Sequence, residues 1–134
     1  MDSKLTLFSQ IISKIDRVIF KKIVKEKKTD YRNKGFDSWT HLVSMLFCHF
    51  AKSTSVRDIS NGLRSATGNL NHLGIKTAPS KSSISYQNGK RDADLFKDVY
   101  FKLLEQLGQH TKERRIKLKI KVPVYLLDST LISL

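Results

Sequence analysis

Residues 37–50 read D-S-W-T-H-L-V-S-M-L-F-C-H-F, and this stretch decides the fold class. Its apolar residues recur at spacings of three, four and seven, which places them on one face of a helix. They are Trp39, Leu42, Val43, Leu46, Phe47 and Phe50. Asp37 or Ser38 can accept hydrogen bonds from the free backbone N–H groups at the start of such a helix. The stretch therefore predicts a core helix in a mainly α-helical protein.

Helical spacing continues on both sides of this stretch. Upstream, apolar residues repeat every three or four positions over residues 7–24. There, Asp16 fits either as the N-cap of a second helix or as the bend in a single one. Downstream, residues 92–107 carry paired apolar residues on every turn, and Gly108 is a natural helix end. We therefore expect a helical domain over residues 1–110.

The charge of the chain points to its partner. Lys and Arg number 25 against 12 acidic residues, which gives 134 residues a formal net charge of +13. Such a surplus favours nucleic acid first and an anionic membrane surface second, with a merely solvated basic surface as the alternative. No apolar run approaches the ~18 residues of a membrane span, and no signal peptide is recognisable. The single Cys48 suits a reducing compartment, so we expect a soluble intracellular protein.

A second polar segment is the candidate for DNA contact. Residues 80–91 read S-K-S-S-I-S-Y-Q-N-G-K-R and predict an exposed helix, rich in side chains that bond phosphates and base edges. A capped helix over residues 56–63 and a long connector precede it, which resembles a loose helix–turn–helix. A poorly amphipathic surface helix is the alternative. The residues expected to contact DNA are Arg57, Lys81, Ser82, Ser83, Asn88, Lys90 and Arg91.

From residue 111 onward the pattern changes from helix to strand. Apolar residues alternate with lysines over residues 116–122, the period-two pattern of a half-exposed strand. Pro123 separates this run from the continuous apolar run of residues 124–127, which is typical of a strand buried on both faces. The end of the chain is therefore predicted to form a short β-hairpin or strand pair.

Metal-binding side chains are few. His41 and His49 lie eight residues apart, not at the i, i+4 spacing of a helical metal pair, so we interpret both as structural. Asp128 directly follows the apolar run of residues 124–127, where its charge needs a metal ion or another partner. Such carboxylates hold Mg²⁺ in phosphoryl-transfer sites, but a strand-end cap explains Asp128 equally well.

Five stretches of the chain resemble, in order, one enzyme family. V-Y-L-L-D-S-T-L-I-S-L at the end of the chain resembles the first catalytic strand of DDE-type transposases of bacterial insertion sequences. The helical N-terminal domain that precedes this strand in the family is similar to four upstream stretches. These are F-D-S-W-T-H-L-V-S-M-L-F (36–47), S-V-R-D-I (55–59), H-L-G-I (72–75) and S-S-I-S-Y-Q-N-G-K-R-D (82–92).

The resemblance implies a helical DNA-binding domain over residues 1–110, then the start of a truncated ribonuclease-H-like α/β domain over residues 111–134. In these enzymes that domain cuts and joins DNA with Mg²⁺, and Asp128 matches the first catalytic, metal-binding Asp. The second Asp and the Glu have no counterpart, so the resemblance implies no catalysis by this chain alone. It implies a cytoplasmic, nucleoid-associated bacterial protein. Its partners would be double-stranded DNA at element ends and a second copy or a full-length transposase, with no membrane.

Two other interpretations stay open from the sequence. The chain fits a truncated, non-catalytic DNA-binding protein, such as a transposase remnant or regulator. It also fits an RNA-binding or helical interaction protein unrelated to transposition, for which equal binding to unrelated RNA would be the supporting result.

Overall fold

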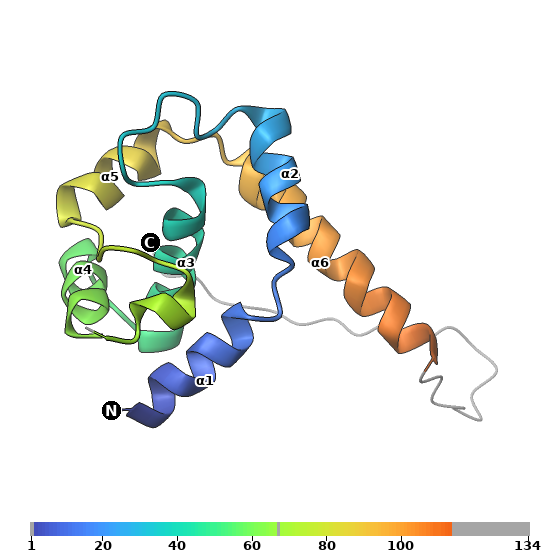
Figure 1. The fold of residues 1–134 in the computed structure, drawn as a ribbon, viewed down its shortest axis with the longest axis horizontal. Coiled ribbons are helices and arrows are strands. Elements are labelled where there is room, and N and C mark those ends of the chain that lie inside the picture. Colours follow the sequence, from blue (N-terminus) through green and yellow to red (C-terminus); the bar gives the residue numbers. More distant parts are fainter. Residues whose placement is uncertain (1, 67, 114–134) are drawn as a thin grey trace.

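The computed structural model describes residues 2–66 and 68–113, and this part of the chain is helical (Figure 1). The helical spacing of apolar residues in 37–50 predicts this α-helical fold class. The elements, in chain order, are α1 (Asp2–Ile12), α2 (Arg17–Lys27), α3 (Ser38–Ala51), α4 (Val56–Ser65), the 3₁₀ helix η1 (Leu70–Leu73), α5 (Lys81–Lys90) and α6 (Asp94–Glu113).

The predicted fold class is wrong in its second part. We expected a β-hairpin or strand pair that begins a truncated ribonuclease-H-like domain, yet residues 2–66 and 68–113 contain no strand. Gly108 does not end α6, which continues to Glu113 and so passes the expected boundary at residue 110. One glycine costs a helix only about 1 kcal/mol, which the helix formers around it offset. The two runs predicted as strands, over residues 116–127, lie outside the described residues.

Short polar side chains fix where the helices begin. Asp16 accepts hydrogen bonds from the first free backbone N–H groups of α2, so this region forms two helices and not a single bent one. Asp37, Ser55 and Ser80 cap α3, α4 and α5 in the same way. Each cap satisfies backbone donors that would otherwise lack partners at the helix start.

The core lies around α3, which packs against α1, α4 and α5, while α6 packs along α2 (Figure 1). The predicted face of α3 is buried at Trp39, Leu42 and Val43, and it opens toward Phe50, whose exposure is 50%. The indole N–H of Trp39 donates to the carbonyl oxygen of Leu73 at 2.8 Å, which fastens η1 to the core. The connector between α4 and α5 therefore contributes Leu73 and η1 to the core.

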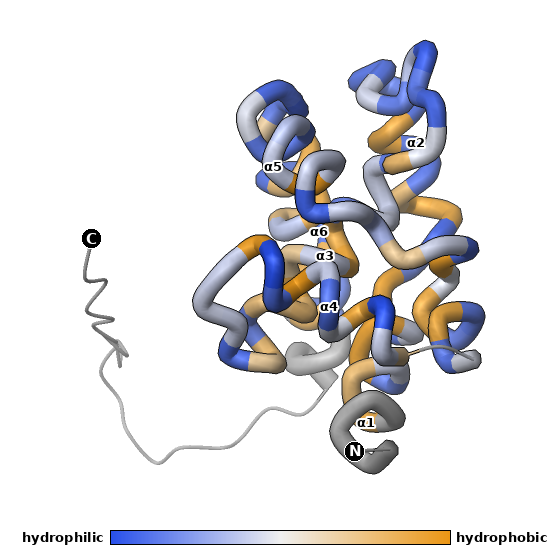
Figure 2. Tube along the Cα trace, turned by 90° about the vertical axis from the view of Figure 1, so that its left-hand side faces the viewer, coloured by the Kyte–Doolittle hydropathy of each residue, from blue (hydrophilic) through white to orange (hydrophobic). Residues whose placement is uncertain are grey.

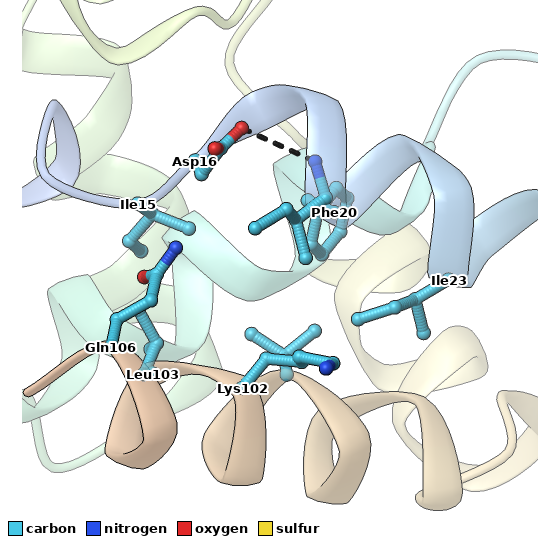
Figure 3. Close-up of a pocket in the computed structure, with 9 residues that line it drawn as sticks. Ile15, Asp16, Phe20, Ile23, Lys102, Leu103 and Gln106 are labelled. Atoms are coloured by element: carbon cyan, nitrogen blue, oxygen red, sulfur yellow. Dashed lines mark hydrogen bonds between the residues drawn. The ribbon is translucent and has the colours of Figure 1, made fainter. Parts of the chain in front are cut away.

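A small cavity lies where α2 and α6 meet (Figure 3). Its volume is about 10 Å³, close to the space of one water molecule and far below that of a ligand site. Its lining includes Phe20 and Ile23 of α2, Lys102 and Leu103 of α6, and Ile15, which precedes α2. We interpret it as a gap in packing and not as a binding site.

Candidate nucleic-acid interface

A basin of about 540 Å³ opens between α5 and the segment that links α2 to α3. Five of its lining residues are Lys or Arg and one is acidic, so we call it the basic basin. In Figure 2, hydrophilic residues gather along α5 and at the end of α2 that leads into this segment. The lining residues are Lys27, Thr29, Tyr31, Arg32, Asn33, Lys34, Phe36, Ser83, Tyr86, Gln87, Lys90, Arg91 and Asp92.

The wall formed by residues 28–36 has an unusual backbone. Lys28 ends α2 with a φ of 53°, and Arg32 has a φ of 58°. Residues with a Cβ rarely adopt these left-handed angles, which cost roughly 1–2 kcal/mol each. Such strain occurs often at functional positions. Lys28 has this angle as the C-cap of α2, whereas Arg32 caps no helix, so the backbone of this wall singles out the exposed Arg32 as a candidate for function.

Arg91 fastens this wall to the end of α5. Its Nη2 donates to the carbonyl oxygen of Phe36 at 2.9 Å, and its Nη1 donates to that of Asp37 at 3.2 Å. Nη2 also lies 3.4 Å from a carboxylate oxygen of Asp30, which in turn accepts from the N–H and the hydroxyl of Ser38. The Arg91 side chain is only 2% exposed. We call this set of contacts the Arg91 latch.

The charge of Arg91 persists despite its burial. Burial lowers the pKa of the guanidinium, while the Asp30 and Asp37 carboxylates raise it. An arginine stays protonated in proteins because its ordinary pKa is so high. The latch is therefore a charged interaction in the wall of the basin, and Arg91 joins α5 to the segment of residues 30–37.

Asn88 is exposed, but its side chain bonds to a buried histidine. Its Oδ1 accepts a hydrogen bond from Nε2 of His41, at 3.0 Å. The His41 ring is 2% exposed and lies between the rings of Phe36 and Phe96, at centroid distances of 5.3 and 5.1 Å. Among the described residues, nothing bonds the buried Nδ1 of this histidine. The interpretation of His41 as structural fits these surroundings.

The stability of the protein should depend on the protonation of His41. Burial lowers the pKa of His41, the nearby Arg91 charge adds to this, and the hydrogen bond to Asn88 opposes it. Because native His41 binds its proton less tightly than the unfolded chain does, acid favours unfolding. The stability of the fold with neutral His41 is fully present above the ordinary histidine pKa of about 6.5, and it is lost as the pH falls below that value. We expect urea unfolding at mildly acidic pH to show a smaller loss of stability in His41→Gln than in the wild type. Equal losses would contradict this.

The residues predicted to contact DNA divide into three groups. Ser83 and Lys90 line the basic basin, as does the latched Arg91. Lys81 and Ser82 are exposed at the start of α5, beside the basin but not in its lining. The two others lie apart from the basin: Arg57 is exposed on α4, and Asn88 is bonded to His41.

The sequence did not single out the wall opposite α5. Residues 29–35, T-D-Y-R-N-K-G, have the composition of a polar loop, yet they supply Tyr31, Arg32, Asn33 and Lys34 to the basin. Two cations interleaved with a tyrosine and an amide were the available signal, because these types bind phosphates and bases together. Nothing in the sequence places this loop next to α5.

The described part of the chain offers neither a metal-binding cluster nor a membrane-spanning helix. Residues 2–66 and 68–113 hold no cluster of three or more His, Cys, Asp or Glu side chains suited to a metal ion. Asp128, the predicted Mg²⁺ ligand, lies outside these residues. None of the helices in the described ranges has both the length and the apolar character needed to cross a membrane.

Comparison with known protein families gives a match to a domain family. The family model described as "Domain of unknown function (DUF4372)" matches residues 3–76, which is more than half of the chain. The match includes the Tyr31–Lys34 wall of the basin and ends before α5. No curated protein and no solved structure matches the chain.

Proposed function

We propose that this chain, which belongs to the DUF4372 family of domains of unknown function, binds double-stranded DNA at the basic basin as part of a transposase. The observation that supports this most is the meeting of two basic segments far apart in the sequence. Lining residues from 27–36 and from 83–92 together form a concave surface with five cations and one acid, Asp92. A concave surface of one charge sign concentrates the field and attracts a polyanion.

Three of the cations in the basin are available to phosphates. Lys27 is paired with Asp98, at 3.1 Å between Nζ and the carboxylate, and Arg91 belongs to the latch. Arg32, Lys34 and Lys90 are exposed, and Lys90 donates to the Tyr86 hydroxyl with only one of its three hydrogens. These three side chains are the expected phosphate contacts.

The α5 helix is built to present polar groups to such a ligand. Ile84 is fully buried and anchors the helix on the core. Ser83 and Gln87 lie in the basin wall, where a hydroxyl and an amide can bond phosphates or base edges. The Oγ of Ser60 donates to the carbonyl oxygen of Pro79 at 2.9 Å, which holds the start of α5 against α4. The helix thus offers a polar face from a fixed position.

The transposase part of the proposal comes from the sequence resemblance. Three of the four stretches that resemble the N-terminal domain of these enzymes, at residues 36–47, 55–59 and 72–75, fall inside the family match, and the fourth contains most of α5. The resemblance narrows the proposed ligand from double-stranded DNA in general to the DNA ends of a mobile element. The role of Asp128 as a Mg²⁺ ligand in a complete enzyme stays a prediction.

The salt dependence of binding tests the proposal. Each phosphate contact contributes about −0.9 to the slope of log K against log salt, so three contacts predict a slope near −2.7. Between about 50 and 200 mM salt, the affinity for a labelled duplex should then fall roughly 40-fold. Fluorescence anisotropy with the full chain measures this, and an RNA duplex of equal length is the control. A nearly flat dependence, or equal affinity for RNA, would contradict the proposal.

A further inference from the structure

Two tyrosine rings stand exposed in the basic basin. Tyr31 is 71% exposed and Tyr86 is 60% exposed, although both line the same concave surface. Each has a cation beside its ring: the guanidinium carbon of Arg32 lies 5.2 Å from the Tyr31 centroid, and Nζ of Lys90 lies 5.1 Å from that of Tyr86. Neither tyrosine belongs to the core. The two rings therefore do not pack in the core, and their exposed faces can contact a ligand.

Duplex DNA alone leaves these rings unused. The bases of a duplex are stacked inside it, so its phosphates can reach the basin cations while no base presents its face to a tyrosine. An unpaired base has a free aromatic face, and stacking on protein rings next to a basic groove is how single strands are held. Gln87 and Asn33 also line the basin and offer amides that pair with base edges. The volume of about 540 Å³ lies in the range of sites for small ligands.

We infer that the basic basin holds an unpaired nucleotide of a DNA strand that leaves a duplex, with its base stacked on Tyr31 or Tyr86. The phosphates of the same strand lie against Arg32, Lys34 and Lys90. This inference rests on the proposed function and extends it from duplex DNA to a duplex with a single-stranded end. A phosphorylated peptide would also suit the cations, but it gives no use for two rings flanked by amides.

The test compares a blunt duplex with the same duplex carrying a short single-stranded tail, both bound by the full chain. One stacked base should raise the affinity of the wild type for the tailed duplex about tenfold over the blunt one. The double variant Tyr31→Ala/Tyr86→Ala should bind both duplexes with the affinity of the wild type for the blunt one. Both side chains are exposed, so the variant should fold normally. Tyr31→Phe/Tyr86→Phe keeps the rings and should keep the tenfold preference.

Two controls separate stacking from charge. A tail of abasic sugars carries the same phosphates without bases and should add little to the affinity of the wild type. A fluorescent base analogue in the tail should be quenched by the wild type and not by the double alanine variant.

Four results would overturn the inference. They are an equal affinity of the wild type for tailed and blunt duplexes, a preference that survives in the double alanine variant, one that an abasic tail reproduces, and displacement of the tail by a phosphopeptide of higher affinity. In each of these, blunt-duplex binding still supports the proposed function. Loss of binding to every DNA would instead remove both.

Discussion

Replacing Arg32, Lys34 and Lys90 together should weaken duplex binding by about 100-fold, since each phosphate contact contributes about 1 kcal/mol and 1.4 kcal/mol is a factor of ten. The slope of log K against log salt should become less negative by about 2 to 3. The variant is best made as Arg32→Gly, Lys34→Gln and Lys90→Gln. Glycine accepts the φ of 58° at Arg32 without strain, so this change does not destabilise the loop.

The chain offers a charge-matched control for this variant. Lys14, Lys52 and Lys76 are exposed and none of them lines the basic basin. Lys52 follows the end of α3, whose first residue Ser38 touches the Arg91 latch, so a helix length of about 20 Å separates the two. Replacing these three lysines by Gln removes the same charge and should lower affinity only a few-fold. Equal losses in the two triple variants would show that the net charge, and not the basin, determines binding.

The second large effect is on stability. Replacing Arg91 by Met should lower the free energy of unfolding by about 3 kcal/mol, because the partly buried Asp30 carboxylate and the carbonyls of Phe36 and Asp37 then lose their donor. Arg91→Lys keeps the charge but cannot bond all three groups with a planar fork, so it should recover only part of the loss. Urea unfolding of the full chain measures both.

A neighbouring cation is the control for the latch. Lys90→Met removes the same charge from the adjacent residue, which is exposed, and should change the stability by no more than about 0.5 kcal/mol. The assignment of Arg91 to the latch would be contradicted if Arg91→Met were as stable as Lys90→Met. In that case the guanidinium would be free for DNA, as the sequence alone suggests.

Most helices of the described part follow from local sequence. The spacing of apolar residues predicts α3, and the helix predicted over residues 80–91 agrees with α5, because caps and periodicity act within a few residues. The predicted end of α6 at Gly108 was wrong, because one glycine does not stop a helix when helix formers follow it. These successes and this error all concern interactions within one turn or two of a helix.

The site depended on contacts that sequence cannot place. Asn88 and Arg91 have the side-chain types of DNA-binding residues, but their partners lie 47 and 55 residues away, at His41 and Phe36. Only the packing of α5 against α3 and the loop before it brings these two side chains to those partners. The same packing brings the loop with Tyr31 opposite α5 and so creates the basin.

The most direct test of the basic basin as the DNA site is a map of backbone amide shifts by NMR. Duplex DNA added to the isotope-labelled full chain should shift the amides of residues 31–34 and 83–90, the two walls of the basin. Those of Lys14 and Lys52 should stay in place. Shifts concentrated on the exposed lysines of α2 or around Arg57 on α4, with the two walls unchanged, would contradict the assignment of DNA binding to the basin.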